Sequence, residues 1–313
     1  MKIKDIYAGL DCMKVFVIGG SGFIGHALIN GLKAEGYQLT VLLRRGNKQE
    51  DTDRSILHVM GDPMEPGRWQ DVMIEHDVVI NLAGAAIFRR WSDEVKAEIL
   101  NSRIVTTRHI VETIRKAQNR NIQFFNASGI GYYGYCGDEV NDEGALHGDT
   151  FIARVALDWE LEARKAEEAG ARVVLCRFGI VLGESGGAMR KISTLAKLYL
   201  GGMWGSGKQW FSWIHEKDVV NIFHFLLKNP NIAGAVNFTA PEPVRNMEMV
   251  STFRKVLKKS SITGAIPAVL FELVLGEFSR VFLNGQRVVP RKLIENGFAF
   301  QYPTLEEALT DLL

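Results

Sequence analysis

The chain has 313 residues, and its 37 Lys and Arg nearly balance its 36 Asp and Glu, for a net charge of +1. That balance does not indicate a nucleic-acid or membrane-surface partner. Hydrophobic residues make up 47% of the chain, which suits a buried core. No apolar stretch reaches the roughly 18–20 residues that are needed to span a bilayer.

Residues 1–12 precede the first apolar run and lack the long apolar region of a secretion signal, so we treat them as an N-terminal extension. The three cysteines, at positions 12, 136 and 176, are scattered and form no C-x-x-C pair. This usage indicates a reducing compartment and no structural disulfide. We therefore expect a cytoplasmic protein.

A strand, a glycine turn and a helix follow one another at the start of the folded region. The apolar run Val15–Ile18 leads into a turn with glycines at positions 19, 22 and 25, and an amphipathic helix is expected over 23–35. Gly19 allows the tight turn, Gly22 lets the backbone approach a pyrophosphate, and Gly25 lets the helix pack closely on the strand. The N–H groups that begin the helix can bind phosphates. The residues expected to form this dinucleotide site are Gly19, Ser21, Gly22, Phe23, Ile24 and Gly25. The alternative is an ordinary βαβ unit with permissive turn glycines.

The residues that follow the next strand, expected over 39–43, indicate whether the cofactor is NAD or NADP(H). A site for NAD places an acidic residue here to bind the ribose 2′-hydroxyl. This chain has Arg44 and Arg45 instead, and no acid until Glu50. A guanidinium can bind a 2′-phosphate through paired hydrogen bonds, whereas a carboxylate would repel it. We predict NADP(H), with Arg44 as the main contact and Arg45 as support; the alternative is a solvated basic loop.

Strand and helix patterns alternate through the first 180 residues. The apolar runs are short and rich in Val and Ile, which is typical of parallel strands buried on both faces. Further strands are expected at 56–60, 78–82, 122–127 and 172–178, and further helices at 92–117 and 151–169. Right-handed crossovers would place helices on both faces of the sheet. The predicted fold class is α/β, with a Rossmann doubly wound parallel sheet.

Beyond residue 183 the pattern loosens. We expect a helix at 216–228, a strand at 235–239, and a last helix that begins with a capping box of Thr304 and Glu307. The rest would form a small, mostly helical lobe over the carboxyl edge of the sheet, where ligands bind in open α/β folds. The expected division is an NADP-binding Rossmann domain of residues 13–183 with about 216–240, and a C-terminal substrate lobe of residues 184–215 and 241–313.

Small residues follow the expected fourth strand. Leu82, Ala83 and Gly84 would let the adenosine half of a cofactor lie against the backbone. Asp62, after the third strand, could accept a hydrogen bond from the adenine amine. The alternative for Asp62 is a turn residue ahead of Pro63.

Three further positions could touch the cofactor. Arg103, on the long helix after Gly84, could reach a phosphate or ribose, and Glu98 lies five residues before it. The alternative for these two is a surface ion pair. The backbone near Leu182 leaves the sixth strand at the carboxyl edge, where it could bond the nicotinamide amide.

These motifs together resemble those of the extended short-chain dehydrogenase/reductases, the superfamily of the nucleotide-sugar epimerases and dehydratases. The glycine turn, the segment 81–84 and the region from Ser128 to Gly134 carry the resemblance. Trp91, Ser102-Arg103, 131–134, 158–160, 177–183 and 213–215 resemble the atypical branch called the epimerase family proteins. The tail over 267–298 is similar to that branch's C-terminal DUF1731-type domain of unknown function. The resemblance covers residues 13–313 and implies a nucleotide-binding oxidoreductase or epimerase.

One departure from the superfamily concerns its proton donor, a tyrosine followed four residues later by lysine. None of the seven tyrosines here has lysine at that distance. On the helix where the pair belongs, alignment places Phe151 and Val155. A phenyl ring cannot donate a proton and valine cannot hold a ribose. The usual hydride-transfer groups are therefore absent from their usual place.

Ser128, at the end of the fifth strand, occupies the position of the superfamily's substrate-orienting serine. Tyr132 and Tyr133 follow in one loop, where either could act as a displaced acid; the alternative is that both pack the cleft wall. An unperturbed tyrosine has a pKa of about 10. The residues expected to furnish the substrate cleft are Arg177, Trp213 and His215. Residues 215–218 do not share one helix face, so we expect no metal site.

Two hypotheses follow. In the first, the protein is an NADP(H)-dependent oxidoreductase or epimerase in which Ser128 orients a small-molecule substrate and Tyr132 or Tyr133 supplies the proton. In the second, it is a non-catalytic NADP(H)-binding sensor or regulatory protein. The missing Tyr-x-x-x-Lys pair favours the second, and the furnished cleft favours the first. The resemblance also allows a homodimer through helices that flank the sheet.

Overall fold

The structure is a computed structural model that describes residues 13–44, 55–117, 121–184, 186, 203–258 and 267–313. Its centre is a parallel seven-stranded sheet with the order β11-β7-β5-β4-β1-β2-β3. The strands are β1 (Lys14–Ile18), β2 (Gln38–Leu43), β3 (Ile56–Met60), β4 (Val78–Asn81), β5 (Gln123–Gly129), β7 (Arg172–Phe178) and β11 (Gly234–Phe238). The chain runs outward from β1 to β3 on one side and then from β4 to β11 on the other. The strand order therefore reverses between β1 and β4, which is where open α/β sheets bind ligands.

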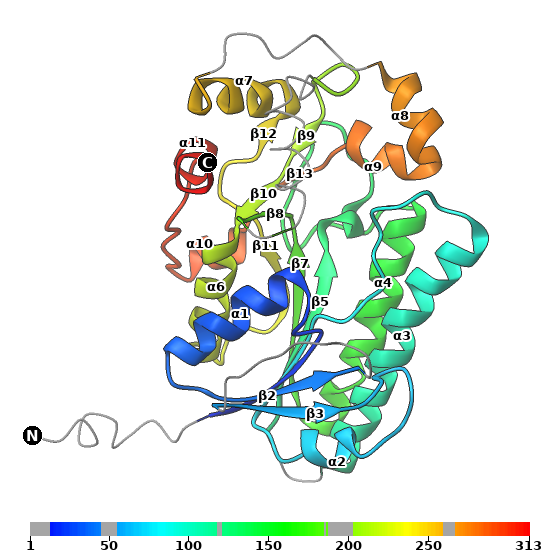
Figure 1. Cartoon of the computed structure of the whole chain (residues 1–313), viewed down its shortest axis with the longest axis vertical. Helices are drawn as coiled ribbons and strands as arrows, with labels where there is room; N and C mark the ends of the chain where they lie inside the picture. Colours follow the sequence, from blue (N-terminus) through cyan, green and yellow to red (C-terminus); the bar gives the residue numbers. More distant parts are fainter. Residues whose placement is uncertain (1–12, 45–54, 118–120, 185, 187–202, 259–266) are drawn as a thin grey trace, which may run out of the picture.

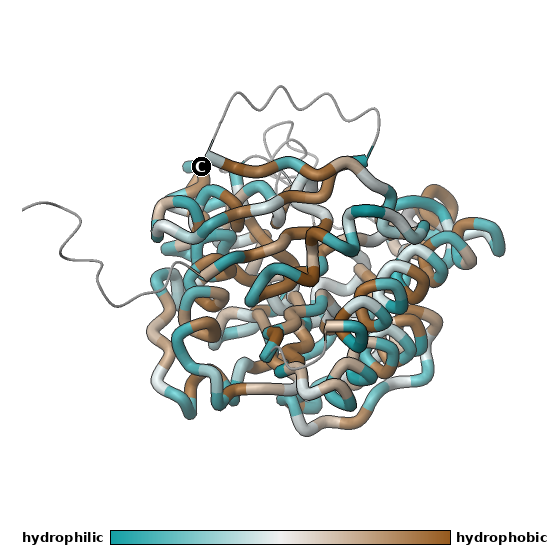
Figure 2. Tube along the Cα trace, turned by 90° about the horizontal axis from the view of Figure 1, so that it is seen from below, coloured by the Kyte–Doolittle hydropathy of each residue, from teal (hydrophilic) through white to brown (hydrophobic). Residues whose placement is uncertain are grey.

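Helices cover both faces of the sheet (Figure 1). On one face, α1 (Phe23–Ala34) and α6 (Glu216–Lys228) pack against the strands and each other. On the other face lie α2 (Trp69–Met73), α3 (Asp93–Lys116) and α4 (Phe151–Arg164). In Figure 2 hydrophobic segments lie mainly in the interior. Along the outer helices, hydrophobic and hydrophilic residues alternate. This burial on both faces explains the continuous apolar runs of the strands.

A third group of elements stands above the carboxyl ends of the strands, at the top of Figure 1. The short strands are β6 (Val140–Asn141), β8 (Ile180–Leu182), β9 (Trp210–Phe211), β10 (Trp213–His215), β12 (Val244–Arg245) and β13 (Arg287–Val288). The helices are α7 (Asn246–Val256), α8 (Ala268–Leu275), α9 (Ser279–Leu283) and α11 (Leu305–Leu312), while α10 (Arg291–Glu295) lies lower, beside β11. A separate apolar cluster, which includes Trp213, Phe253 and Leu309, holds β8, β10, α7 and α11 together.

The predicted Rossmann fold is confirmed, and the bounds of β3, β7 and α6 agree with the expected ranges. The capping box of Thr304 and Glu307 is present at the start of α11. The helix expected over 151–169 ends earlier, at Arg164, and a 3-10 turn over Glu167–Ala169 follows it. That turn closes at Gly170, whose φ of +80° is the left-handed conformation that ends helices.

Several expectations fall on positions outside the described ranges: Arg45, the extension 1–12 and most of 184–202. Within those ranges, no helix is long and apolar enough to cross a bilayer. The same residues hold no cluster of three or more His, Cys, Asp or Glu that could bind a metal ion.

Candidate functional site

The glycine turn lies at the point where the strand order reverses. Gly19 has a φ of +84°, and a Cβ added there would lie 2.7 Å from the backbone of both Leu82 and Ala83 at the end of β4. A Cβ at Gly25 would overlap the Gly19 carbonyl oxygen. The Gly22 amide donates to that same oxygen at 3.1 Å, which closes the turn. Backbone packing thus requires glycine at positions 19 and 25, while a Cβ at Gly22 would lie 3.3 Å from the Gly19 oxygen. Together the three glycines form the narrow turn that the sequence predicts.

The first turn of α1 presents backbone N–H groups toward the carboxyl edge of the sheet. Its N-cap residue, Gly22, supplies no side-chain cap, and no acidic residue stands in the first turn. The dipole and the uncapped amides favour an anion at this position. A dinucleotide pyrophosphate therefore fits the residues that are present.

Arg44 follows β2 directly and is exposed at the same edge. Asp62 follows β3, and its Oδ1 accepts a hydrogen bond from the Met64 amide at 2.9 Å. This hydrogen bond makes Asp62 a turn residue, which was the alternative that the sequence offered. The other carboxylate oxygen, Oδ2, takes no part in it. Of the small residues after β4, Ala83 donates its amide to Asn81 Oδ1 at 3.1 Å, which fixes the segment beside the glycine turn.

Arg103 bends back toward this segment from α3. Its guanidinium donates to the carbonyls of Ala85 and Ile99 at 2.9–3.2 Å and lies 5.0 Å from the centre of the Trp159 ring. Burial lowers the pKa of Arg103 to about 10. Glu98 does not join it: its carboxylate forms an exposed ion pair with Arg89. The predicted Glu98 contact with a cofactor is thus replaced by the surface ion pair, because the Glu98 side chain leaves the helix on the solvent side.

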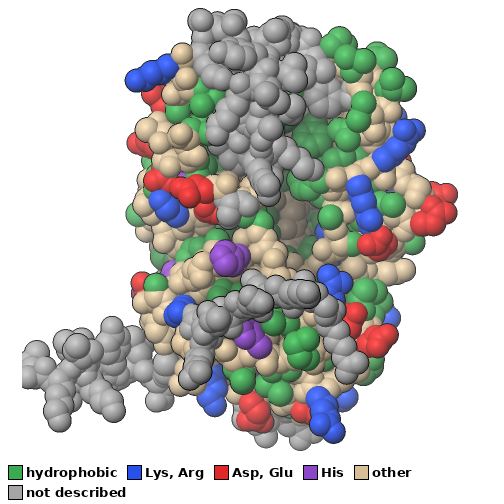
Figure 3. Space-filling view, viewed as in Figure 1, with side chains coloured by type: hydrophobic (Ala, Val, Ile, Leu, Met, Phe, Trp, Pro, Cys, Tyr) green, Lys and Arg blue, Asp and Glu red, His purple; other side chains and the backbone are tan. Residues whose placement is uncertain are grey.

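A cavity of about 340 Å³ lies between the carboxyl edge of the sheet and the upper elements. Figure 3 shows the molecule hollowed there, with hydrophobic side chains along the wall. Phe23 and Ile24 of α1 line it at the dinucleotide end, and Trp204 and Phe282 line it at the other. From α4, Ile152, Val155, Ala156 and Trp159 face it at the spacing of one helix face. Val155, which the sequence comparison predicts at the lysine position of the superfamily, is thus an apolar part of the wall.

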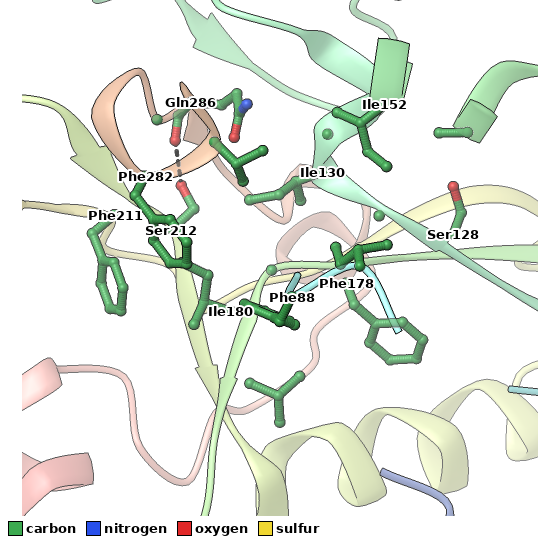
Figure 4. A pocket seen from close by; sticks show the side chains of 18 of the residues that line it. Phe88, Ser128, Ile130, Ile152, Phe178, Ile180, Phe211, Ser212, Phe282 and Gln286 are labelled. Carbon is green, nitrogen blue, oxygen red and sulfur yellow. Dashed lines mark hydrogen bonds between the residues drawn. The ribbon is translucent and has the colours of Figure 1, made fainter. Parts of the chain in front are cut away.

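Ser128 is one of the polar residues that line this cavity (Figure 4). Its Oγ donates a 2.7 Å hydrogen bond to Glu160 Oε1. Glu160 in turn accepts two hydrogen bonds from Arg177, at 2.8 Å from Nε and 2.7 Å from Nη2. Glu160 and Arg177 are both only 3% exposed. Burial alone would lower the pKa of Arg177, but the Glu160 carboxylate outweighs that effect and raises it, so the guanidinium remains charged.

Tyr133 is tied into the same network and does not reach the cavity. It is 1% exposed, its hydroxyl donates to Asn237 Oδ1 at 2.7 Å, and the hydroxyl accepts from Arg177 Nη1 at 3.0 Å. Burial raises the pKa of Tyr133 to about 12. Tyr132 packs against the guanidinium of Arg177, 3.5 Å from ring centre to Cζ. The prediction that either tyrosine faces the substrate is therefore wrong, and the packing alternative holds.

The tyrosine that lines the cavity is Tyr135, which sequence reasoning missed. Gly134, with a φ of +69°, ends the 3-10 turn over Ile130–Tyr133 and reverses the chain so that the next side chain points to the cavity. Burial is the main cause that raises the pKa of Tyr135, with Arg280 opposing and Glu277 adding to it. No spacing rule identifies Tyr135, because its orientation depends on the backbone of this turn.

The three residues expected to furnish the substrate cleft lie elsewhere. Arg177 is buried beneath the floor with Glu160. Trp213 is buried in the upper apolar cluster, where its indole donates to the Glu242 carbonyl at 3.2 Å. His215 caps α6, with Nδ1 accepting from the Lys217 amide at 3.0 Å, and stacks on Tyr302 at 4.0 Å. The strand β10 turns Trp213 and His215 inward, which corrects the prediction. The Leu182 side chain is buried in the same cluster, and its neighbour Val181 lines the cavity. The backbone contact near Leu182 with a nicotinamide amide stays a prediction.

The buried position of His215 predicts a pH-dependent stability. Burial lowers the pKa of His215 from 6.5 to about 4; Lys217 contributes to this lowering and Asp311 opposes it. Between these values the unfolded chain binds a proton that the folded chain excludes, so stability falls as the pH drops from 6.5 to 4. This group contributes a loss of about 3 kcal/mol at most. The free energy of unfolding in urea, measured at several pH values, should therefore fall more steeply for the natural chain than for His215→Asn. Parallel curves would contradict it.

Two family models match the chain. One, described as the NAD dependent epimerase/dehydratase family, matches residues 15–237, and the other, a domain of unknown function (DUF1731), matches residues 266–312. The chain is 38% identical over 307 residues to the chloroplastic epimerase family protein SDR39U1 homolog of Arabidopsis thaliana, covering 96% of this chain and 87% of that protein.

Solved structures are similar over the same length. The human epimerase family protein SDR39U1 (isoform 2), crystallised with NADPH, has a TM-score of 0.83 at 31% identity and covers 96% of this chain and 99% of its own. UDP-glucose 4-epimerase from Thermus thermophilus, in complex with NAD, has a TM-score of 0.76 at 18% identity, covers 96% of this chain and 97% of its own, and shares the fold alone.

Proposed function

This chain belongs to the NAD-dependent epimerase/dehydratase family, and we propose that it binds NADP(H) and acts as an oxidoreductase or epimerase without the usual Tyr-x-x-x-Lys pair. The resemblance drawn from the sequence motifs is confirmed by the family models and by the relatives. The observation that carries the choice of cofactor is the likeness to the human protein crystallised with NADPH, at 31% identity over nearly the whole chain. Arg44 at the end of β2 agrees with that choice.

Different residues of this chain would bind the different parts of the cofactor. The amides that begin α1 would bind the pyrophosphate, Arg44 the 2′-phosphate, and the backbone of Leu82 and Ala83 the adenosine half. Phe23 and Ile24 would direct the nicotinamide end into the cavity. When bound, the nicotinamide accepts or supplies a hydride.

The polar groups of the cavity would position the substrate. Because the Ser128 hydroxyl donates its proton to Glu160, it offers its lone pairs to the cavity and can accept a hydrogen bond from a ligand. The raised pKa of Tyr135 keeps its phenol protonated at neutral pH, so that it can donate. We propose Tyr135 as the proton donor in place of Tyr132 and Tyr133.

Replacing Tyr135 by Phe should lower turnover by about 100-fold or more, which is the usual loss when a general acid is removed. NADPH affinity should be unchanged. Tyr133→Phe is the matched control: it should lower the free energy of unfolding by about 1–2 kcal/mol, because a buried hydroxyl between two partners is lost, and leave turnover intact. NADPH oxidation over a panel of carbonyl compounds measures the first effect, and urea unfolding measures the second. Equal turnover losses in both variants would contradict the role of Tyr135.

One observation favours the second hypothesis, a non-catalytic NADP(H)-binding sensor or regulatory protein. Among the described residues that line the cavity, only Arg103 and Tyr135 have ionisable side chains. These described lining residues include no His, Asp, Glu, Lys or Cys, the residue types that most often act as acids, bases or nucleophiles. Tight NADPH binding, without oxidation by any compound of the panel and without any effect of Ser128→Ala, would support that hypothesis against the enzyme.

The upper elements would form the substrate lobe. We propose that residues 13–183 with about 216–240 bind the nucleotide and that 184–215 and 241–313 enclose the substrate. The apolar cluster shared by β8, β10, α7 and α11, distinct from the two clusters on the faces of the sheet, supports this division.

A further inference from the structure

The wall of the cavity beyond the dinucleotide end is mostly apolar where the described residues form it. Phe88, Ile130, Ile152, Ile180, Phe211 and Phe282 surround it, as Figure 4 shows. Trp204 and Trp210 add two large rings. A volume of about 340 Å³ lies within the usual range for small-molecule pockets.

Three of the polar side chains that line the cavity, Ser212, Gln209 and Asn246, form hydrogen bonds within the protein. Ser212 donates to the Gln286 carbonyl at 2.7 Å and accepts from the Val288 amide at 3.0 Å. Gln209 donates to the carbonyls of Trp204 and Phe282, at 2.9 and 3.2 Å. Asn246 Oδ1 accepts from the Trp204 amide at 2.9 Å. Their remaining amide atoms, Gln209 Oε1 and Asn246 Nδ2, are buried and have no hydrogen-bond partner. The side-chain amide of Gln286 also lines the cavity. A ligand with many hydroxyl groups would therefore leave most of them unpaired, at a cost of about 1–3 kcal/mol each.

The cationic groups that a diphosphate requires are also committed elsewhere. Arg103, the one cation among the described lining residues, donates to two backbone carbonyls near the glycine turn. Arg245 and Arg287 lie nearby but stack on the outer ring of Trp210, at 3.9 and 4.6 Å, and Arg245 pairs with Asp138 at 2.6 Å. Neither arginine lines the cavity.

We propose that the cavity takes an uncharged, largely apolar small molecule with a flat body, and that it excludes nucleoside-diphosphate sugars. The aromatic walls supply stacking area, and Ser128, Tyr135 and the Gln286 amide supply a few polar contacts. This inference rests on the proposed function, because it assigns a ligand class to the cavity that adjoins the proposed cofactor site.

The test uses Nile red, a neutral flat dye, and the full chain saturated with NADP⁺. We expect saturable binding of one dye per chain, and no displacement by UDP-glucose at millimolar concentration. Ile152→Glu should weaken the dye at least 10-fold because it places a charge in the apolar wall. Ile152→Trp should weaken it similarly by filling the space.

Two control variants separate the cavity from the exposed surface. Val269 is 71% exposed on the apolar helix α8, and Leu146 is 87% exposed in a loop. Val269→Glu and Leu146→Glu should leave dye binding unchanged. NADPH titration of every variant reports whether the nucleotide-binding fold is retained.

Displacement of the dye by UDP-glucose would overturn the proposal. So would dye binding that is lost in Val269→Glu but retained in both Ile152 variants, or no saturable binding at all. If the dye binds as expected while NADPH and NADP⁺ do not bind the natural chain, the proposed function fails and the ligand class of the cavity stands.

Discussion

Replacing Arg44 with glutamate should weaken NADPH binding by about 100–1000-fold and leave NADH binding nearly unchanged, which would reverse the preference of the protein. The guanidinium stands at the end of β2, exposed at the edge where the strand order reverses. Hydrogen bonds from this guanidinium to a 2′-phosphate would be charge-assisted and would contribute about 1.5–3 kcal/mol. A carboxylate at the same position removes them and adds repulsion. Titration of both coenzymes, followed by their fluorescence, measures the two affinities.

The change from Arg to Glu also alters the net charge by two units. The control must therefore make the same change in charge at a position far from the proposed cofactor site. Lys116 ends α3, which runs from the carboxyl edge of the sheet back to the opposite edge, and it is exposed. Lys116→Glu should leave the affinity for both coenzymes within a factor of about two, since a charge more than a Debye length away is screened. Equal affinity of the natural chain for NADPH and NADH would remove the basis for the cofactor proposal.

Removing Glu160 should produce the largest loss of stability among the buried polar residues of this site. Glu160→Ala leaves the Arg177 guanidinium without its carboxylate at 3% exposure, and it also leaves Ser128 without its acceptor. Breaking a buried ion pair on one side costs about 3–5 kcal/mol. The free energy of unfolding, measured by urea denaturation at neutral pH, should fall by that amount.

Glu162 is a matched control on the same helix. It is also largely buried, but its partners Lys165 and Arg108 are half-exposed, at 2.7 and 3.4 Å. Glu162→Ala should cost less than about 1 kcal/mol because exposed partners can turn to water. The double variant Glu160→Met, Arg177→Met should recover more than half of the loss, because no charge is left buried. Similar losses from Glu160→Ala and Glu162→Ala would contradict the role given to the buried pair.

Local rules predicted much of the fold. The strands are continuous apolar runs because helices bury them on both faces, and that composition is visible in the sequence. The glycine turn was also predicted, since only glycine accepts the φ of +84° at Gly19 and the close approach of β4. The start of α11 followed from a capping pattern within four residues.

The interior of the candidate site depends on contacts between residues far apart in the sequence. Glu160 lies 32 residues from Ser128, and Tyr133 lies 104 residues from Asn237, so no spacing rule relates them. Because Trp213 and His215 follow a glycine-rich loop, the sequence predicts that they line the cleft. The pairing of β10 with β8 instead directs both side chains into the core.

The sequence by itself determined the elements, the dinucleotide turn and the basic residue after β2, because each depends on a few neighbouring residues and on their backbone conformation. Only the tertiary structure decided which tyrosine faces the cavity and which polar groups remain available to a ligand. Tyr132, Tyr133 and Tyr135 are chemically alike, and it is the 3-10 turn, the positive φ of Gly134 and the buried acceptor Asn237 that separate them. Side-chain direction and hydrogen-bond commitment are set when distant segments pack together.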